Sequence, residues 1–135
     1  MEKYFNMFTV FFGALGGFFA HALGGYDSIL NTVLCLTVID MITGLINGFY
    51  NKKLNSHKCV DGIIKKVYIY ITIGFAVVID NWLHHSIPLR EVVITFYIVN
   101  EGLSILENIG KVIPYPDKLK ELFEQLKDGG VIDGK

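Results

Sequence analysis

The sequence predicts an all-α integral membrane protein with four transmembrane helices followed by a short C-terminal amphipathic helix. Two observations lead to this fold class. First, the 135-residue chain is 52% hydrophobic and 19% charged, with a mean hydropathy of +0.45, whereas soluble domains carry roughly 25% charged residues. Second, lysine and arginine are nearly absent from four long segments and gather between and after them. Each segment falls within the roughly 17–25 residues that a helix needs to cross a bilayer.

The first predicted span, residues 4–24, is rich in phenylalanine and carries small residues on one face. Small residues spaced four apart let helix backbones approach closely in lipid. The second span carries a similar pair. We therefore expect the following residues to pack helices together: Gly13, Gly16, Gly17, Ala20, Gly44 and Gly48.

Two alternative interpretations concern the N-terminus. Met7 to Phe19 could be the apolar part of a signal peptide cleaved after Ala20-His21-Ala22. The length of the run, the acidic Glu2 before it and the second apolar span after it favour an uncleaved helix. Met7 could also be a second translation start, although packing explains an internal methionine in an apolar run more simply.

The second predicted span, residues 29–50, has a carboxylate near its centre. A carboxylate at that depth costs roughly 2.5–3.5 kcal/mol on insertion scales. Asp40, Thr43 and Asn47 follow one another in steps of three and four, so they share one helix face. A polar face on a spanning helix has to lie against protein or water, which predicts an interface or a water path there.

The third predicted span, residues 67–83, follows a polar loop and ends beside Trp82, an aromatic residue typical of membrane interfaces. We assign four lysines to this loop and its edges, as anchors on the cytoplasmic leaflet. On this assignment, no basic residue within the spans neutralises the intramembrane carboxylates. The anchoring lysines are Lys52, Lys53, Lys65 and Lys66.

Cysteines and histidines do not suggest a metal site. Cys35 lies within the second span and Cys59 within the loop, so we expect two free thiols. His84 and His85 are adjacent, and neighbouring positions diverge without a third ligand nearby. We therefore expect no metal and no cofactor.

The fourth predicted span, residues 92–113, is the most polar of the four, and its polar residues again step by three and four. One polar residue could simply join two helices, but matching polar faces on two spans exceed what that needs. We predict that these residues line a pore or lie between protomers: Asp40, Thr43, Asn47, Asn100, Glu101, Ser104, Glu107 and Asn108.

Residues 117–127 form the predicted amphipathic helix, with leucines and Phe123 along one stripe. Such a short helix can neither span a bilayer nor be stable alone, so it should lie on the membrane or dock on a partner. We divide the chain into a transmembrane domain, residues 1–113, and a cytoplasmic part, residues 114–135. Residues 131–135 are expected to be disordered.

The basic residues predict the orientation. With four spans, the N-terminus, the middle loop and the C-terminal part lie on one side with all eleven lysines, and the other side has only Arg90. Positive residues mark the cytoplasmic side, so we predict that both termini are cytoplasmic. The net charge of −1 sums two compartments, and we expect no nucleic-acid partner.

Three functional classes fit a small protein with intramembrane carboxylates. An intramembrane aspartyl protease would need paired aspartates, but Asp40 is central, Asp80 is near an interface and the chain is small, so we predict no enzyme. A small ion channel or proton-coupled transporter using Asp40 and Glu101 fits better, although no internal repeat or filter-like sequence is present. The third class is a self-assembling protein that opens lesions.

Sequence motifs distinguish the last two classes. Asp40-Met41-Ile42-Thr43-Gly44, Leu54-Asn55-Ser56, Gly62 with Lys65-Lys66, and the string from Asn100 to Asn108 resemble the toxin-secretion/phage-lysis holin family. The segment from Pro114 to Lys127 is similar to the C-terminal helix of its clostridial TcdE-type members. The resemblance covers about residues 28–128 in order, and the first span matches mainly in being apolar and glycine-rich.

The resemblance implies a small protein of the bacterial inner membrane that forms homo-oligomeric lesions. Through such lesions a cell-wall hydrolase or a large toxin reaches the outside. The implied partners are the lipid bilayer, further copies of the chain and the passing cargo. We infer that protomers associate through the small-residue and polar faces of the first, second and fourth spans, and that opening turns the carboxylates toward water.

Overall fold

The chain is described by a computed structural model that covers residues 1–114 and 116–128. In this part of the chain the helices are α1 (Glu2–Ala22), α2 (Ser28–Tyr50), α3 (Ser56–Trp82), α4 (Leu89–Gly110) and α5 (Asp117–Lys127). The first four are each long and apolar enough to cross a bilayer. The predicted fold class is confirmed. The tail at 131–135, predicted to be disordered, lies outside the described residues.

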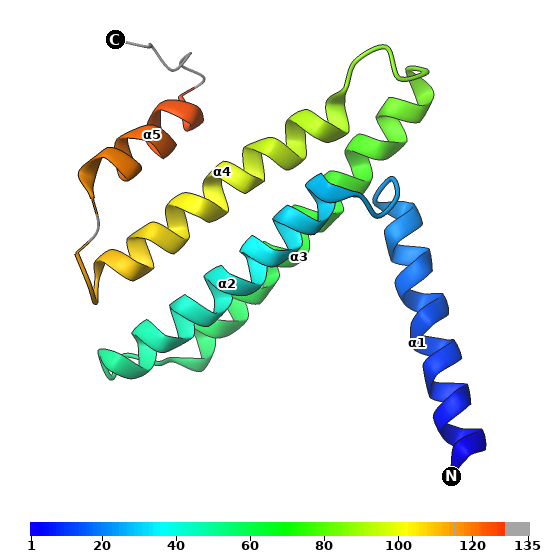
Figure 1. Cartoon of the computed structure of the whole chain (residues 1–135), viewed down its shortest axis with the longest axis horizontal. Helices are drawn as coiled ribbons and strands as arrows, with labels where there is room; N and C mark the ends of the chain where they lie inside the picture. The colour runs from blue at the N-terminus through cyan, green and yellow to red at the C-terminus, as the bar shows by residue number, and fades with distance from the viewer. Residues whose placement is uncertain (115, 129–135) are drawn as a thin grey trace.

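Helix α4 is the centre of the bundle. Both α2 and α3 pack against α4 more extensively than against each other, and α5 turns back to lie along α4 (Figure 1). The apolar core joins α2, α3 and α4, and it is formed by Leu30, Val33, Ile69, Ile73 and Ile94. Because α4 contacts every other bundle helix, the polar residues on its buried face, such as Glu101, lie where the helices meet.

Helix α1 diverges from the bundle, so that only its C-terminal end approaches α2 and α3 (Figure 1). None of its residues is buried. A Cβ atom added at Gly13, Gly16 or Gly17 would meet nothing within 4 Å. No other described residue therefore covers the face of α1 that carries Gly13, Gly16 and Gly17.

The start of α3 differs most from the sequence-based boundaries. The expected loop up to residue 66 is a short turn, because α2 ends at Tyr50 and α3 begins at Ser56. The side chain of Asn55 caps the N-terminus of α3 by accepting a hydrogen bond from the His57 amide at 3.0 Å. Polar residues in the first turns of α3 lower the local hydropathy, which made this part of the helix look like a loop. Cys59 consequently lies on the helix, and both cysteines are free, as predicted.

Helix α5 has the predicted bounds and docks on α4 of its own chain. The ring of Phe123 lies over Gly102: a Cβ atom at Gly102 would come within 2.5 Å of Cε1 of that ring. Gly102, Leu103 and Leu106 of α4 are buried. The sequence predicted that this helix lies on the membrane or docks on a partner, whereas the structure shows it docked on α4 of the same chain.

Candidate functional site: an ionic network inside the bundle

The most unusual feature of the bundle is a lysine placed between two carboxylates from different helices. Nζ of Lys66 on α3 donates to Asp40 Oδ2 on α2 and to Glu101 Oε2 on α4. The three side chains are largely shielded from solvent, with exposed fractions of 14%, 11% and 7%. These ion pairs join all three helices of the bundle at one point. With both carboxylates ionised, the network carries one net negative charge.

Amide hydrogen bonds extend the network along α2 and α4. Nδ2 of Asn108 donates to Asp40 Oδ1 at 3.1 Å and to Thr43 Oγ1 at 3.0 Å. Nδ2 of Asn47 in turn donates to the Asn108 carbonyl at 2.9 Å. Among the described residues, every buried side-chain nitrogen or oxygen has a hydrogen-bond partner. The polar faces of α2 and α4 thus satisfy each other within one protomer.

The remaining predicted polar residues lie at the edges of this network. Asn100 and Ser104 are half-buried and line a hollow between α3 and α4, whereas Glu107 is exposed. Gly44 approaches the network, since its Cβ would lie 3.8 Å from Asn108 Nδ2. Gly48 packs instead against Leu54 of the α2–α3 turn. The structure therefore joins five of the predicted polar residues in one network with Lys66 and leaves Glu107 outside it; the five are Asp40, Thr43, Asn47, Glu101 and Asn108.

The prediction that no basic residue within the spans neutralises the carboxylates is wrong. It rested on placing Lys66 at the edge of a loop, whereas α3 begins ten residues earlier and carries Lys66 into the bundle. The sequence held a signal for this. Lys66, Ile69, Ile73, Ala76 and Asp80 follow steps of three and four, and the last four are buried. Extending the buried stripe by one step would have included Lys66.

A second interhelical contact was also missed by sequence reasoning. The Tyr70 hydroxyl on α3 donates to Thr37 Oγ1 on α2 at 2.9 Å. Thr37 also donates to its own helix, to the Val33 carbonyl at 2.7 Å, as is common for threonine in spans. This bond lies one turn of α2 from Asp40 and adds to the polar contacts that hold α2 and α3 together.

A separate ionic cluster lies at the other end of the bundle. The Arg90 guanidinium donates to both carboxylate oxygens of Asp27, at 2.8 and 3.1 Å, in a bidentate pair. It also donates to the carbonyls of Leu23 at 2.6 Å and Gly25 at 3.0 Å. Gly24 permits this approach because it has no Cβ atom: a Cβ built there would lie 2.5 Å from Arg90 Nε. Its φ of +89° is also a conformation that favours glycine. Arg90 therefore ties the α1–α2 turn to the start of α4.

Two carboxylates at this end of the bundle also accept hydrogen bonds from the first amides of helices. Asp27 accepts the Leu30 amide at 3.0 Å at the start of α2, and Asp80 accepts the Leu89 and Arg90 amides at 3.0 and 2.8 Å at the start of α4. Hydrogen bonding to the Arg90 guanidinium holds the pKa of Asp27 below its usual value of 3.8, with the Leu30 amide contributing and partial desolvation opposing. Asp27 thus stays ionised beside Arg90.

These features define a class: a small α-helical membrane protein with four spans, in which a lysine pairs with two carboxylates between the helices of one protomer. The family model described as the bacteriophage holin family matches residues 17–128. The chain belongs to the bacteriophage holin family. The match leaves out most of α1, the helix that stands apart from the bundle.

Curated bacterial and phage proteins are similar to most of this chain. An uncharacterised 14.9 kDa protein in the nagH 3′ region of Clostridium perfringens is 36% identical over 130 residues, which are 95% of this chain and 98% of that protein. An uncharacterised protein of Listeria monocytogenes is 37% identical over 114 residues, 82% of this chain and 81% of its own. A protein of Bacillus phage phi105 named "probable holin" is 34% identical over 90 residues, 67% of each chain. No solved structure matches the chain.

Family membership and the four apolar helices make this chain a multi-pass protein of the bacterial inner membrane. The family also implies insertion and oligomerisation in general. The similarity to the TcdE-type subgroup and the predicted orientation stay predictions.

Proposed function

We propose that this protein is a holin that assembles with copies of itself into inner-membrane lesions and has no enzymatic activity. A cell-wall hydrolase or a large toxin passes through these lesions to the outside. The observation that carries the proposal is α1: a 21-residue apolar helix with no buried residue, in a chain of the bacteriophage holin family.

The exposed small-residue face of α1 supports self-association. In lipid, helices associate by van der Waals packing and hydrogen bonds, because lipid tails are as apolar as leucine. Gly13, Gly16 and Gly17 leave room for close approach of another backbone. The α1 helix of one protomer would then pack against a neighbouring protomer through this face.

The ionic network defines the closed protomer in this proposal. Asp40, Lys66 and Glu101 pair inside the bundle, so these three side chains are kept away from lipid in the closed protomer. When protomers reach a threshold density, helix rearrangement in the assembly exposes these side chains to water. They then line the lesion together with Asn100, Ser104 and the other polar residues of α2 and α4.

The proposed orientation places both termini and the α2–α3 turn in the cytoplasm. Lys52 and Lys53 in the turn are exposed, as is Lys65 on α3. Lysines near an anionic leaflet gain about 1 kcal/mol each. These three lysines anchor the turn at the headgroups, whereas Lys66 serves in the ionic network instead.

The proposal is tested by inducing the protein in bacteria and measuring release of a small dye and of a large cytoplasmic enzyme. A holin lesion releases both, with a delay after induction. Release of the dye alone would identify the runner-up function, a small ion channel using Asp40 and Glu101. Release of neither would point to a proton-coupled transporter or an accessory protein, and would overturn the proposal.

A pair of α1 variants tests the self-association step. Gly13→Leu/Gly17→Leu fills the small-residue face and should still insert, but should lower enzyme release by about tenfold or more. Leu15→Phe adds bulk on the opposite face of α1 and serves as the matched control, with release like the unmodified protein. Equal release by both variants would contradict the role of this face. Crosslinking in membranes should show oligomers for the control and monomers for the glycine variant.

A further inference from the structure

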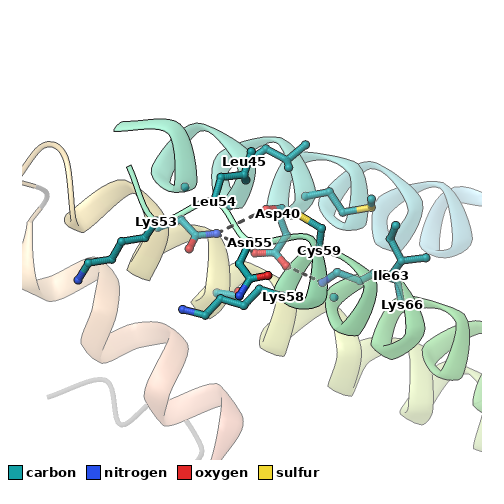
Figure 2. A pocket seen from close by; sticks show the side chains of 15 residues that line it. Asp40, Leu45, Lys53, Leu54, Asn55, Lys58, Cys59, Ile63 and Lys66 are labelled. Carbon is teal, nitrogen blue, oxygen red and sulfur yellow. Dashed lines mark hydrogen bonds and ion pairs between the residues drawn. The ribbon is translucent and has the colours of Figure 1, made fainter. Parts of the chain in front are cut away.

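A cavity of about 370 Å³ opens between α2 and α3 beside the ionic network. It reaches from the α2–α3 turn to Asp40 and Lys66, and Ser104 and Asn108 of α4 also line it. Figure 2 shows the surrounding side chains, with Leu45 on α2 and Ile63 on α3. The cavity exists because α2 and α3 each pack mainly on α4 and little on each other.

The walls of the cavity are largely apolar and kept open by glycines. Met41 and Leu45 of α2 and Ile63 of α3 are apolar wall residues, and each is exposed. Gly44, Gly48 and Gly62 are also wall residues, and a Cβ at Gly62 would meet nothing within 4 Å. An elongated apolar group therefore has room along this wall.

One end of the cavity is cationic. Lys53 of the turn and Lys58 of α3 line it there, and Figure 2 shows their side chains extending in the same direction. Neither forms an ion pair with another described residue, in contrast to Lys66. Lys58 and Lys66 are eight positions apart on α3, or about 12 Å along the helix. The ammonium groups of Lys53 and Lys58 thus lie next to an apolar wall, in the same order as the headgroup and the upper chain of a lipid, and the cavity ends beyond this wall at Asp40 and Lys66.

We propose that this cavity binds one anionic glycerophospholipid of the phosphatidylglycerol class. The phosphate lies between the Lys53 and Lys58 ammonium groups, and the upper part of one acyl chain lies along Met41, Leu45 and Ile63. Basic pockets between spans are suited to anionic headgroups, and charge complementarity favours an anionic lipid over a zwitterionic one. An apolar wall continuous with the cations favours a lipid over a free phosphate. The proposal requires only that the protein inserts in a bilayer and is independent of lesion formation.

The experiment uses the full chain in nanodiscs of phosphatidylcholine with a minor share of phosphatidylglycerol. Native mass spectrometry then counts retained phosphatidylglycerol after release from the nanodisc. The unmodified protein should retain one such lipid. Lys53→Gln/Lys58→Gln should lower its apparent affinity by about tenfold or more, since each lysine near anionic lipid is worth roughly fivefold. Lys118→Gln/Lys120→Gln, which removes two exposed lysines of α5, is the matched control and should leave retention unchanged.

A second variant separates a bound lipid from general surface attraction. Gly62→Leu fills the cavity without changing charge and should reduce retention as strongly as the double lysine variant. Unchanged retention in Gly62→Leu, or equal losses in the α5 control, would overturn the proposal. In a Cys35→Ser background, phosphatidylglycerol should also slow alkylation of Cys59, which lines the cavity and is half-buried. Alkylation at the same rate in pure phosphatidylcholine would likewise count against it.

Discussion

The two ionic clusters of the bundle differ in how far their side chains are exposed to solvent. In the inner cluster, Lys66 lies between Asp40 and Glu101, and all three side chains are at most 14% exposed. In the outer cluster, the Arg90 side chain is 7% exposed but its partner Asp27 is 48% exposed. The inner charges therefore depend on one another, whereas water already solvates part of the outer pair. An ion pair should consequently contribute differently to the free energy of unfolding at the two sites.

The largest effect is expected from breaking the inner cluster. Lys66→Met leaves Asp40 and Glu101 as two buried carboxylates without a cation. Removing one partner of a buried ion pair costs about 3–5 kcal/mol, so the free energy of unfolding should fall by that amount. Unfolding by SDS in mixed micelles, followed by circular dichroism, measures this loss.

Two further variants keep this prediction testable if Lys66→Met fails to insert. Lys65→Met removes an exposed lysine from the same turn of α3 and should leave unfolding nearly unchanged. The triple variant Asp40→Asn/Lys66→Met/Glu101→Gln has no buried charge and should recover most of the lost stability. A Lys66→Met protein as stable as Lys65→Met would show that the inner cluster does not depend on its cation.

A smaller loss is expected at the outer cluster. Arg90→Met removes the bidentate pair with Asp27 and the hydrogen bonds to the Leu23 and Gly25 carbonyls. Because water can reach Asp27, we expect a loss of about 1–3 kcal/mol, measured in the same micelle assay. Glu91→Gln is the control, since its longer contact with Arg90 of 3.6 Å is at an exposed carboxylate and should contribute little. A loss larger than that of Lys66→Met would reverse the comparison.

The outer cluster should also respond to acid. The pKa of Asp27 is lowered in the folded protein, chiefly by its hydrogen bond to Arg90, from an ordinary value of 3.8. Its contribution is therefore fully present above 3.8 and is lost as the pH falls through the lower, folded-state pKa. Unfolding measured across this acidic window should lose less stability in Asp27→Asn than in the unmodified protein. Parallel pH curves for the two proteins would contradict the assignment.

Removing the Asp80 carboxylate should have an effect close to that of losing a helix cap. Pro88 precedes α4 and offers no side-chain acceptor, so Asp80 from α3 accepts the first two amides of α4 instead. Asp80→Ala should lower stability by about 1 kcal/mol, as for other lost caps. Asn81→Ala, at an exposed position next to it, is the matched control. Hydrogen exchange should become faster at Leu89 and Arg90 in Asp80→Ala and stay unchanged in the control.

The sequence predicted the bounds of four of the five described helices well, because few backbone structures are stable in lipid. A run of apolar residues in a bilayer has to satisfy its backbone as a helix, and α1, α2, α4 and α5 are found close to their predicted bounds. The start of α3 was missed because Lys58, Asp61 and Lys65 lower its hydropathy, although all three lie on one continuous helix. Hydropathy reports average composition, whereas the start of this helix is marked by the Asn55 cap, a local hydrogen bond that hydropathy does not register.

The candidate site was only half predictable for the same reason. Steps of three and four placed Asp40 on one face of α2 and Glu101 on one face of α4, and the structure brings these faces together. The residue that neutralises Asp40 and Glu101 lies on a third helix, α3. Because the start of α3 was predicted too late, Lys66 was assigned to a loop and was not considered as their partner. Arg90 was likewise taken only as a marker of orientation, although its guanidinium closes a turn more than sixty residues away. Long-range pairing of this kind is set by packing rather than by local pattern.

The smallest effect on stability is expected at the uncharged contact between α5 and α4. This contact gives a reference value for the comparison of the two ionic clusters. Gly102→Ala places a methyl group against the Phe123 ring, where a Cβ would come within 2.5 Å of Cε1. Overpacking typically costs about 1–3 kcal/mol. Phe123 is only half-buried and can move outward, and alanine is about 1 kcal/mol better than glycine inside a helix, so we expect a net cost below about 1 kcal/mol and partial release of α5. Limited proteolysis near Lys127 should become faster. Adding Phe123→Ala removes the collision, so in that background Gly102→Ala should no longer destabilise the bundle, because alanine favours a helix more than glycine does. If Gly102→Ala instead destabilised the bundle as much as Lys66→Met, close packing of α5, rather than the ionic network, would be the stronger constraint on α4.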